Sequence, residues 1–289
     1  MSLAEVNVVS IARAIEYIEQ NLREAITMAQ IAEAACYSLY HFCRMFNSIT
    51  HYTPYEYLMR RRLSEAARDL VDTDKKIIEI AFDYEFNSPE TFTRAFKRMF
   101  GVQPRQWRKQ GRIPPRLLMP PLTEDYLRHL NQDEALKPVI VKKQAFQIVG
   151  LVTLVQHDLS IVSELWAMVR QELIQTDCSE NAGKFYGIVW YSENREPEGF
   201  FYMAGRESDS QKINCPVLVW KMIPAGQYVQ VLHKGAWRDR RLSLDYLYHT
   251  WLPKSGKHLN FPLEMEVYDP KSEEWKQEDF ALLLPLAIP

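Results

Sequence analysis

The stretch IAFDYEFNSPETFTRAFKRMFGVQPRQWR, from Ile80 to Arg108, decides the architecture of the N-terminal third. It predicts a helix that ends near Asp83 and a second helix that Ser88 caps and Pro89 opens, because serine is favoured at the N-cap and proline at the first helical position. Four apolar residues in the second helix recur at helical spacing and predict a core-facing stripe: Phe92, Ala95, Phe96 and Met99. The stretch therefore predicts a helix-turn-helix unit.

A second copy of this pattern lies about 50 positions upstream, and such self-similarity is sought first in any sequence. Ile31-Ala32 recurs as Ile80-Ala81, and five further residues recur at a common offset: Ser38, Phe42, Arg44, Phe46 and Pro54 match Ser88, Phe92, Arg94, Phe96 and Pro104. Thr27 and Ser38 are the expected helix caps of this copy. Residues 55–71 between the copies predict a helix of roughly 26 Å, long enough to hold two units about one DNA turn, roughly 34 Å, apart.

Residues from about Ser10 to Arg108 resemble the DNA-binding domain of the AraC/XylS family of transcription regulators, and the quoted stretch is the most specific part of that signature. The resemblance implies a bacterial regulator in which the second helix of each unit enters the major groove. Most members place this domain last, whereas here it comes first. The family usually has glycine in each turn, but Cys36 and Glu85 stand there, and a positive φ at a non-glycine residue costs about 1 kcal/mol.

The resemblance also assigns the residues that contact DNA. Arginine pairs with guanine, glutamate accepts from cytosine, and tyrosine and threonine pack on thymine methyl groups. The matching positions are Tyr40, Cys43 and Arg44 on the first helix and Pro89, Glu90, Thr91, Thr93 and Arg94 on the second. Phosphate contacts, which position without specifying, are expected from Arg60, Arg61, Arg62, Arg98 and Arg105. The alternatives are an ion-pair role for Arg44 or Arg94 and a solvated helix face for residues 60–62.

Charge and composition bound the class of protein. The whole chain has a formal net charge of −2, with a surplus of basic residues in residues 1–112 and of acidic residues beyond them. Its 47% hydrophobic and 25% charged residues are typical of globular domains. The four cysteines form no C-x-x-C pair, which argues against structural zinc and a disulfide scaffold. Without a signal pattern or a membrane-length apolar run, we expect a cytoplasmic protein with no cofactor and no membrane partner.

The chain is predicted to have two domains of α+β class: an all-α double helix-turn-helix domain at residues 1–112 and an antiparallel-sheet domain with a pseudo-twofold repeat at residues 137–289. Residues 113–136 between them carry four prolines, which favour an extended linker. A short helix is expected at residues 123–130. The second domain is predicted to contain two helices, at 159–174 and 241–251, and strands at 139–143, 146–155, 186–191, 200–205, 218–223, 227–233, 263–268 and 278–286.

The second domain resembles the effector-binding family named after the gyrase-inhibitory protein. The motifs are YGIVWY at Tyr186, FFYMAG at Phe200, IPAGQYVQVLHKG at Ile223, TWLPKSG at Thr250 and PLEMEVYDP at Pro262. The resemblance implies two similar halves with a ligand cleft between them, and it places the family's Glu-x-Tyr pattern on Glu266 and Tyr268. In relatives that bind drugs, the glutamate at this place meets cationic aromatic ligands.

Aromatic residues are the expected lining of this cleft, because an aromatic face attracts a cation by about 0.5–2 kcal/mol. The candidates are Trp166, Tyr186, Trp190, Tyr202, Trp220 and Tyr228. The alternative for each of them is an ordinary core position, and the alternative for Glu266 is pairing with a lysine or arginine.

Together these patterns predict a sequence-specific DNA-binding transcription regulator, not an enzyme, that is controlled by a small aromatic or amphipathic cationic ligand. Its expected partners are double-stranded DNA, RNA polymerase and the effector, and it is expected to act as a monomer or homodimer. Two alternatives stay open. One is a small-molecule hydrolase in which a glutamate base beside a tyrosine activates water, with DNA binding secondary. The other is a constitutive DNA-binding protein whose pocket is vestigial.

Overall fold

The computed structural model describes residues 3–114, 116–131, 136–176, 183–192, 199–208, 217–269 and 279–287. The chain divides into two compact units, which are described separately below. The helical unit comprises Met1–Ala135 with Tyr248–Thr250, and the sheet unit comprises Leu136–Leu247 with Trp251–Pro289. Within the described ranges, no helix is both long and apolar enough to span a membrane.

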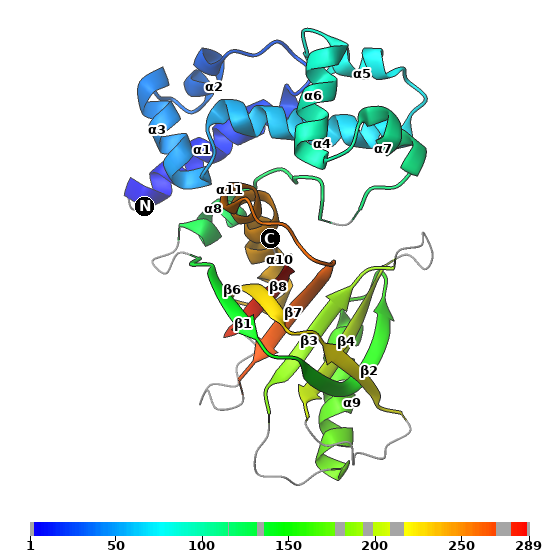
Figure 1. Ribbon diagram of the computed structural model, residues 1–289. Helices are drawn as coiled ribbons and strands as arrows, with labels where there is room; N and C mark the ends of the chain where they lie inside the picture. The colour runs from blue at the N-terminus through cyan, green and yellow to red at the C-terminus, as the bar shows by residue number, and fades with distance from the viewer. Residues whose placement is uncertain are drawn as a thin grey trace. The chain divides into compact units, whose positions relative to one another are not determined.

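The helical unit contains both copies of the repeat, joined by the long helix α4 (Figure 1). Its helices are α1 (Leu3–Gln20), α2 (Met28–Ala34), α3 (Leu39–Thr50), α4 (Pro54–Asp72), α5 (Ile77–Asp83), α6 (Pro89–Phe100), α7 (Pro104–Gln110) and α8 (Glu124–Leu130). The hydroxyls of Thr27 and Ser88 accept the expected capping hydrogen bonds. Ser38 is the N-cap residue of α3 as expected, but its side chain makes no capping hydrogen bond.

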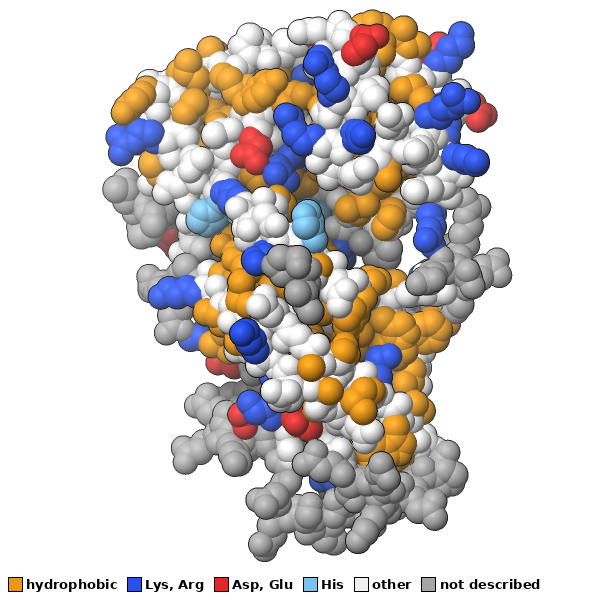
Figure 2. All heavy atoms as spheres, viewed as in Figure 1, with side chains coloured by type: hydrophobic (Ala, Val, Ile, Leu, Met, Phe, Trp, Pro, Cys, Tyr) orange, Lys and Arg blue, Asp and Glu red, His pale blue; other side chains and the backbone are white. Residues whose placement is uncertain are grey.

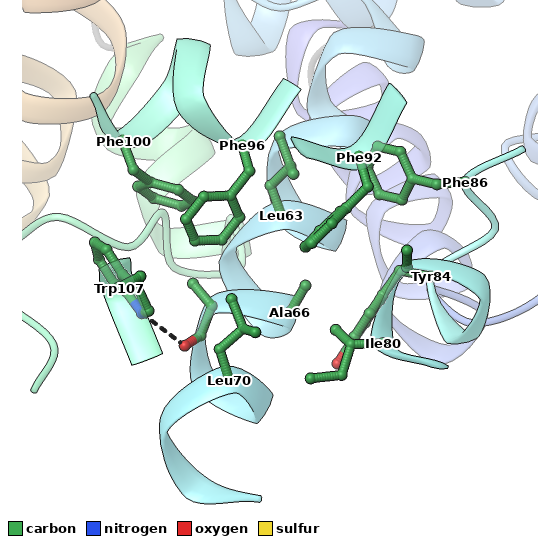
Figure 3. Close-up of a cluster of buried hydrophobic side chains, with 12 residues drawn as sticks. Leu63, Ala66, Leu70, Ile80, Tyr84, Phe86, Phe92, Phe96, Phe100 and Trp107 are labelled. Atoms are coloured by element: carbon green, nitrogen blue, oxygen red, sulfur yellow. Dashed lines mark hydrogen bonds between the residues drawn. The ribbon is translucent and has the colours of Figure 1, made fainter. Parts of the chain in front are cut away.

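Helix α4 is the shared core element of the helical unit. In the second copy, the rings of Phe92, Phe96 and Phe100 on α6 point toward α4, beside Trp107 from α7 (Figure 3). The indole Nε1 of Trp107 donates to the carbonyl of Ala67 on α4 at 3.0 Å (Figure 3). The predicted phenylalanine stripes are therefore core.

The segment predicted as an extended linker is instead packed into the helical unit. Met119, Leu122 and Leu127 are buried, and Thr123 caps α8 by accepting from the backbone of Tyr126 at 3.2 Å. Prolines keep the first part of the segment free of helix, but its apolar side chains still have a surface to cover. Composition alone misses this, because proline content reports local stiffness and not what the flanking leucines contact.

The described residues of the sheet unit form one antiparallel sheet of eight strands in the order β1-β6-β8-β7-β3-β4-β2-β5. One half of the sheet holds β2, β3 and β4, with a helix between β2 and β3, and β5 is its outer edge strand. The other half holds β6, β7 and β8, with a helical segment between β6 and β7, and β1 is its outer edge strand. Each edge strand directly precedes in sequence the first strand of the opposite half. The order is therefore symmetric about the central pair β7·β3, which is the expected pseudo-twofold repeat. The strands are β1 (Val139–Lys143), β2 (Phe146–Val155), β3 (Phe185–Trp190), β4 (Phe200–Glu207), β5 (Val219–Ile223), β6 (Gly226–Lys234), β7 (Leu263–Tyr268) and β8 (Asp279–Leu286).

The two faces of the sheet bury different side chains. Helix α9 (Ser160–Thr176) packs on β2 and β4 over one face, where Val149, Tyr202 and Val189 are buried. The other face buries a second cluster that includes Tyr186 and Met265. Between β6 and β7 the chain runs through a 3-10 turn (Trp237–Asp239), α10 (Arg240–Asp245), a π-helical turn (Tyr246–Trp251) and α11 (Leu252–Ser255).

Candidate nucleic-acid interface and ligand site

The two helix-turn-helix turns share a left-handed residue and the hydrogen bond that follows it. Cys36 and Glu85 have φ values of 59° and 60°, in the left-handed region. The following residues, Tyr37 and Phe86, donate to Ala32 and Ala81, each at 3.0 Å. This is the hydrogen-bond pattern that ends helices at a left-handed residue, usually glycine. The missing glycines therefore leave the turn intact at a cost in backbone strain.

Helix α3 presents the predicted contact residues of the first unit on its solvent face. The side chain of Tyr40 is 75% exposed, and the guanidinium of the exposed Arg44 lies 5.8 Å from the centre of its ring. Cys43 is half-buried. The opposite face of α3 buries Phe42 and Phe46 in the core. Tyr40 and Arg44 are thus held by a packed helix and are free to contact a partner.

Helix α6 presents the matching face of the second unit. Glu90, Thr91, Arg94 and Arg98 are exposed, whereas Thr93 is half-buried. The pKa of Glu90 is lowered by its own backbone N–H, by a hydrogen bond from Ser88 and by the charge of Arg94. This carboxylate is therefore ionised at neutral pH, the form that accepts a hydrogen bond from cytosine.

Arg61 is not a phosphate contact, and that prediction is wrong. Its side chain is 3% exposed and makes three hydrogen bonds of 2.8–3.0 Å to the carboxylate of Glu19, with further bonds to Glu65 and to the carbonyl of Met119. Burial alone would lower the pKa of Arg61, but the bonds and charge of Glu19 raise it above its usual value.

The neighbouring arginines of α4 also serve the helical unit. Arg62 is buried and donates to the carbonyls of Leu22 and Glu24. Arg60 is half-buried beside Glu56, from which its Nε lies 3.1 Å away. On the face of the helical unit shown in Figure 2, Lys and Arg side chains gather with few acidic residues among them.

In the sheet unit, Glu266 lies at the centre of a closed cluster of aromatic donors. It is 1% exposed on β7. Its Oε2 accepts from the hydroxyls of Tyr202 at 2.6 Å and Tyr268 at 2.9 Å, and the indole of Trp237 donates to both carboxylate oxygens at 2.9 Å. The indole of Trp166 on α9 donates to the Tyr202 hydroxyl at 3.1 Å. Burial, followed by the charge of Glu266, raises the pKa of both tyrosines well above the usual value, so both stay protonated donors.

Gly187 makes the room for this cluster. It pairs directly with Glu266 across the central strands β3 and β7. A Cβ at Gly187 would lie 2.2 Å from the Tyr202 hydroxyl and 2.4 Å from Oε2 of Glu266. A side chain there would displace the hydrogen bond between the two, so the glycine of the YGIVWY motif is a requirement of the site.

Arg240 provides the positive charge that the buried carboxylate needs. Its Nε lies 2.9 Å from Oε1 of Glu266, and its side chain is 9% exposed. Its guanidinium carbon lies 3.6 Å from the centre of the Trp237 ring. The alternative stated for Glu266, pairing with a lysine or arginine, is therefore what the structure shows.

Four of the predicted cleft residues do not contact Glu266. Tyr186 and Tyr228 are buried in the cluster on the other face of the sheet, where their hydroxyls donate to Glu207 and to the carbonyl of Pro224. Trp190 packs against the same cluster and stacks on Phe201. Trp220 is 37% exposed on the edge strand β5.

Sequence reasoning missed Trp237, Arg240 and Gly187. The signal for the first two was an aromatic and basic run, GAWRDRR, directly after a strand. Within the described part of the chain, no three His, Cys, Asp or Glu side chains converge as a metal site requires.

Comparisons with known proteins assign each unit to a family. Residues 31–110 match a helix-turn-helix domain, and residues 136–286, more than half of the chain, match the GyrI-like small molecule binding domain.

Curated relatives match the N-terminal third. The chain is 40% identical over 93 residues to the transposon Tn10 TetD protein of Escherichia coli, covering 32% of this chain and 67% of that protein. It is 38% identical over 102 residues to the probable transcription factor PqrA of Proteus vulgaris, covering 35% and 84%. It is 36% identical over 106 residues to the transcriptional regulator Rob of Salmonella typhimurium, covering 37% of each chain. The matched part thus spans two thirds or more of the first two relatives, but about a third of Rob.

Proposed function

From the premise that the chain belongs to the transcription regulators with an AraC-type helix-turn-helix domain, we propose that a small aromatic or amphipathic cation binding at Glu266 controls how it binds DNA. Over more than half of its length, the chain also belongs to the GyrI-like small molecule binding family. The protein is a DNA-binding transcription regulator. The hydrolase alternative has no support from the relatives, which are named as transcription factors and regulators.

The observation that supports sequence-specific DNA binding is the pair of matched helices α3 and α6. Each exposes an arginine, Arg44 or Arg94, on the face opposite its buried phenylalanines. Arg44 and Arg94 are proposed to contact guanine edges, with Tyr40 and Thr91 beside them and Arg98 on phosphate. Since one chain holds both helix-turn-helix units, a monomer suffices to bind two major grooves. RNA polymerase is the proposed protein partner.

The observation that carries ligand control is the buried Glu266 carboxylate within the aromatic cluster of Trp166, Tyr202, Trp237 and Tyr268. Aromatic faces and a carboxylate together favour a cation. A ligand changes DNA binding to the extent that it binds the two states of the protein with different affinity.

The test is to select genomic DNA fragments with the purified full chain and to footprint the winners. We expect protection over two successive major grooves, and a loss of about 1–3 kcal/mol of binding free energy in Arg94→Ala and in Arg44→Ala. Arg238→Ala, which removes an 82% exposed arginine of the sheet unit, is the matched control. Sequence-blind binding that both recognition variants leave unchanged would contradict the assignment of α3 and α6.

A further inference from the structure

The ligand site already contains a cation supplied by the chain itself. Arg240 places its guanidinium against Oε1 of Glu266 and over the ring of Trp237. These two contacts, a carboxylate and an aromatic face, are what an aromatic-lined site offers to a cationic ligand. Ligand and Arg240 therefore require the same partners.

The Arg240 contact is held by charge with little hydrogen bonding. Although Nε lies 2.9 Å from the carboxylate oxygen, its N–H has no hydrogen-bond partner among the described residues. Its Nη1 reaches the carbonyl of Trp237 at 3.5 Å, the outer limit of a hydrogen bond. A buried donor without an acceptor costs free energy, so the position of Arg240 is weaker than a bidentate pair would be.

The carboxylate does not depend on Arg240 for its hydrogen bonds. Tyr202, Tyr268 and Trp237 already donate to it, and a carboxylate has about four acceptor positions. What Arg240 supplies is positive charge. A cation without any N–H, such as a quaternary ammonium group, would supply the same charge.

Arg240 begins α10, directly after a turn of the chain that is not itself buried. The Trp237–Asp239 turn buries none of its residues, and it follows Gly235, whose φ of +121° suits glycine. Its anchors are on either side: His233 on β6 contacts the Ser243 hydroxyl at 2.9 Å.

We propose that Arg240 is the specificity-determining residue of this site: an internal cation that occupies the ligand position and that a ligand must displace from Glu266. The inference rests on the proposed function of the Glu266 site. It predicts that a cation is preferred to a neutral or anionic molecule, because only a cation replaces the charge of the guanidinium, and that the affinity for a cation is set by competition with the guanidinium.

The experiment compares two probes of nearly the same shape, benzyltrimethylammonium and its neutral carbon isostere neopentylbenzene. Binding to the full chain is measured by titration calorimetry for the wild type, Arg240→Ala, Arg240→Gln, Glu266→Gln and Arg238→Ala. Arg240→Gln keeps most of the side-chain length without the charge, and thermal unfolding verifies that each variant is folded. Arg238→Ala removes an exposed arginine two positions away.

We expect both Arg240 variants to bind benzyltrimethylammonium at least about tenfold more tightly than the wild type, with Arg238→Ala unchanged. The neutral isostere should gain less than the cation. Equal or weaker cation binding in folded Arg240 variants would overturn the proposal that Arg240 competes with the ligand.

Glu266→Gln distinguishes a failure of the proposed cation site from a failure of the proposed displacement of Arg240. If it abolishes the preference for the cation while the Arg240 variants gain nothing, the proposed cation site stands and the displacement of Arg240 is wrong. If Glu266→Gln leaves the preference for the cation unchanged, Glu266 is not the cation site, and the proposed function fails together with the inference.

Discussion

A buried arginine contacts a glutamate in each unit of the molecule, Arg61 with Glu19 and Arg240 with Glu266, and the two pairs are built differently. In the helical unit, Arg61 makes three hydrogen bonds to Glu19 and also bonds to Glu65 and the Met119 carbonyl. In the sheet unit, Arg240 approaches Glu266 to 2.9 Å, and its Nε–H is left without an acceptor within the described residues. The first pair satisfies both of its members, whereas the second leaves the arginine replaceable.

The number of hydrogen bonds that each arginine makes distinguishes a structural role from a functional one more clearly than its burial does. A buried charge is tolerated when geometry and hydrogen bonds offset its desolvation, and removal of one partner from such a pair is costly. Arg61 joins α4 to α1 and to the segment before α8, so its loss would leave Glu19 uncompensated. Glu266 keeps the three neutral donors Tyr202, Tyr268 and Trp237 when the Arg240 side chain alone is replaced.

The largest expected effect is on Arg61. Arg61→Met should lower the free energy of unfolding of the helical unit by about 3–5 kcal/mol, and Arg240→Met should lower that of the sheet unit by less than half as much. Urea-dependent hydrogen exchange of peptides from α4 and from β7 measures the two separately. Arg68→Met, on the same helix but 48% exposed, is the control. Equal losses at the two sites would remove the distinction between the pairs.

The second effect concerns the space around Glu266. Gly187→Ala should cost the sheet unit about 1–3 kcal/mol by overpacking, because the new methyl group meets the Tyr202 hydroxyl and the Glu266 carboxylate. It should also abolish cation binding. The matched control is Gly226→Ala on β6, where an added Cβ has an ordinary contact of 3.8 Å. Thermal unfolding and the calorimetric titration are the measurements, and a Gly187→Ala protein that binds like the wild type would refute the crowding.

The third effect is a pH dependence that should be confined to the sheet unit. Burial lowers the pKa of His233, against the opposing influence of the Ala236 carbonyl and of Asp239, Glu266 and Asp279. The unfolded chain therefore binds the proton more tightly than the folded chain. Stability from this group is present above the unfolded value of 6.5 and is lost as the pH falls below it, by at most about 1.4 kcal/mol per pH unit.

Urea unfolding at pH 7.5 and 5.5, followed by hydrogen exchange, measures this loss. The wild type should lose stability in β6 and α10, while His233→Gln should show a shallower dependence. A steeper loss in the helical unit than in the sheet unit would show that another group dominates.

The smallest effect is at the two turns, and it tests whether the two copies of the repeat are equivalent. Cys36→Gly and Glu85→Gly should each stabilise the helical unit by at most about 1 kcal/mol, because glycine relieves the left-handed strain but loses more entropy on folding. The gains should agree, since the turns share one hydrogen-bond pattern. Circular dichroism during thermal unfolding is sufficient, and a loss of stability in either variant would mean that the native side chain contributes more than the strain costs.

Most elements were predictable to within a residue or two. The helices and strands follow from periodicity and capping, as at Thr27 and Ser88, where the hydroxyl accepts from the third residue of the helix. Glu266 was predictable as an unusual residue on a buried strand. These signals are local, since each depends on residues within a few positions of one another.

Which aromatic residues share a face of the sheet with Glu266 was not predictable in the same way, because it depends on the register between strands. Tyr186 pairs with Val267 and Trp190 with Leu263, which places both aromatic residues on the face opposite Glu266. A shift of one residue in that pairing would have reversed the result. The residues of either strand alone do not determine the register between the two strands.

The sequence by itself determined the double helix-turn-helix unit and the strands of the antiparallel sheet, since helical and strand periodicities are local consequences of the side-chain order, and its motifs carried the resemblance to both families. The tertiary structure alone decided what the arginines do. Arg61 and Arg240 are both charged residues on helices, and their roles differ because Glu19 and Glu266, distant in sequence, approach them with different geometry. The energy of a buried charge depends on the distance and hydrogen bonds of its partner, which the order of residues along the chain does not state.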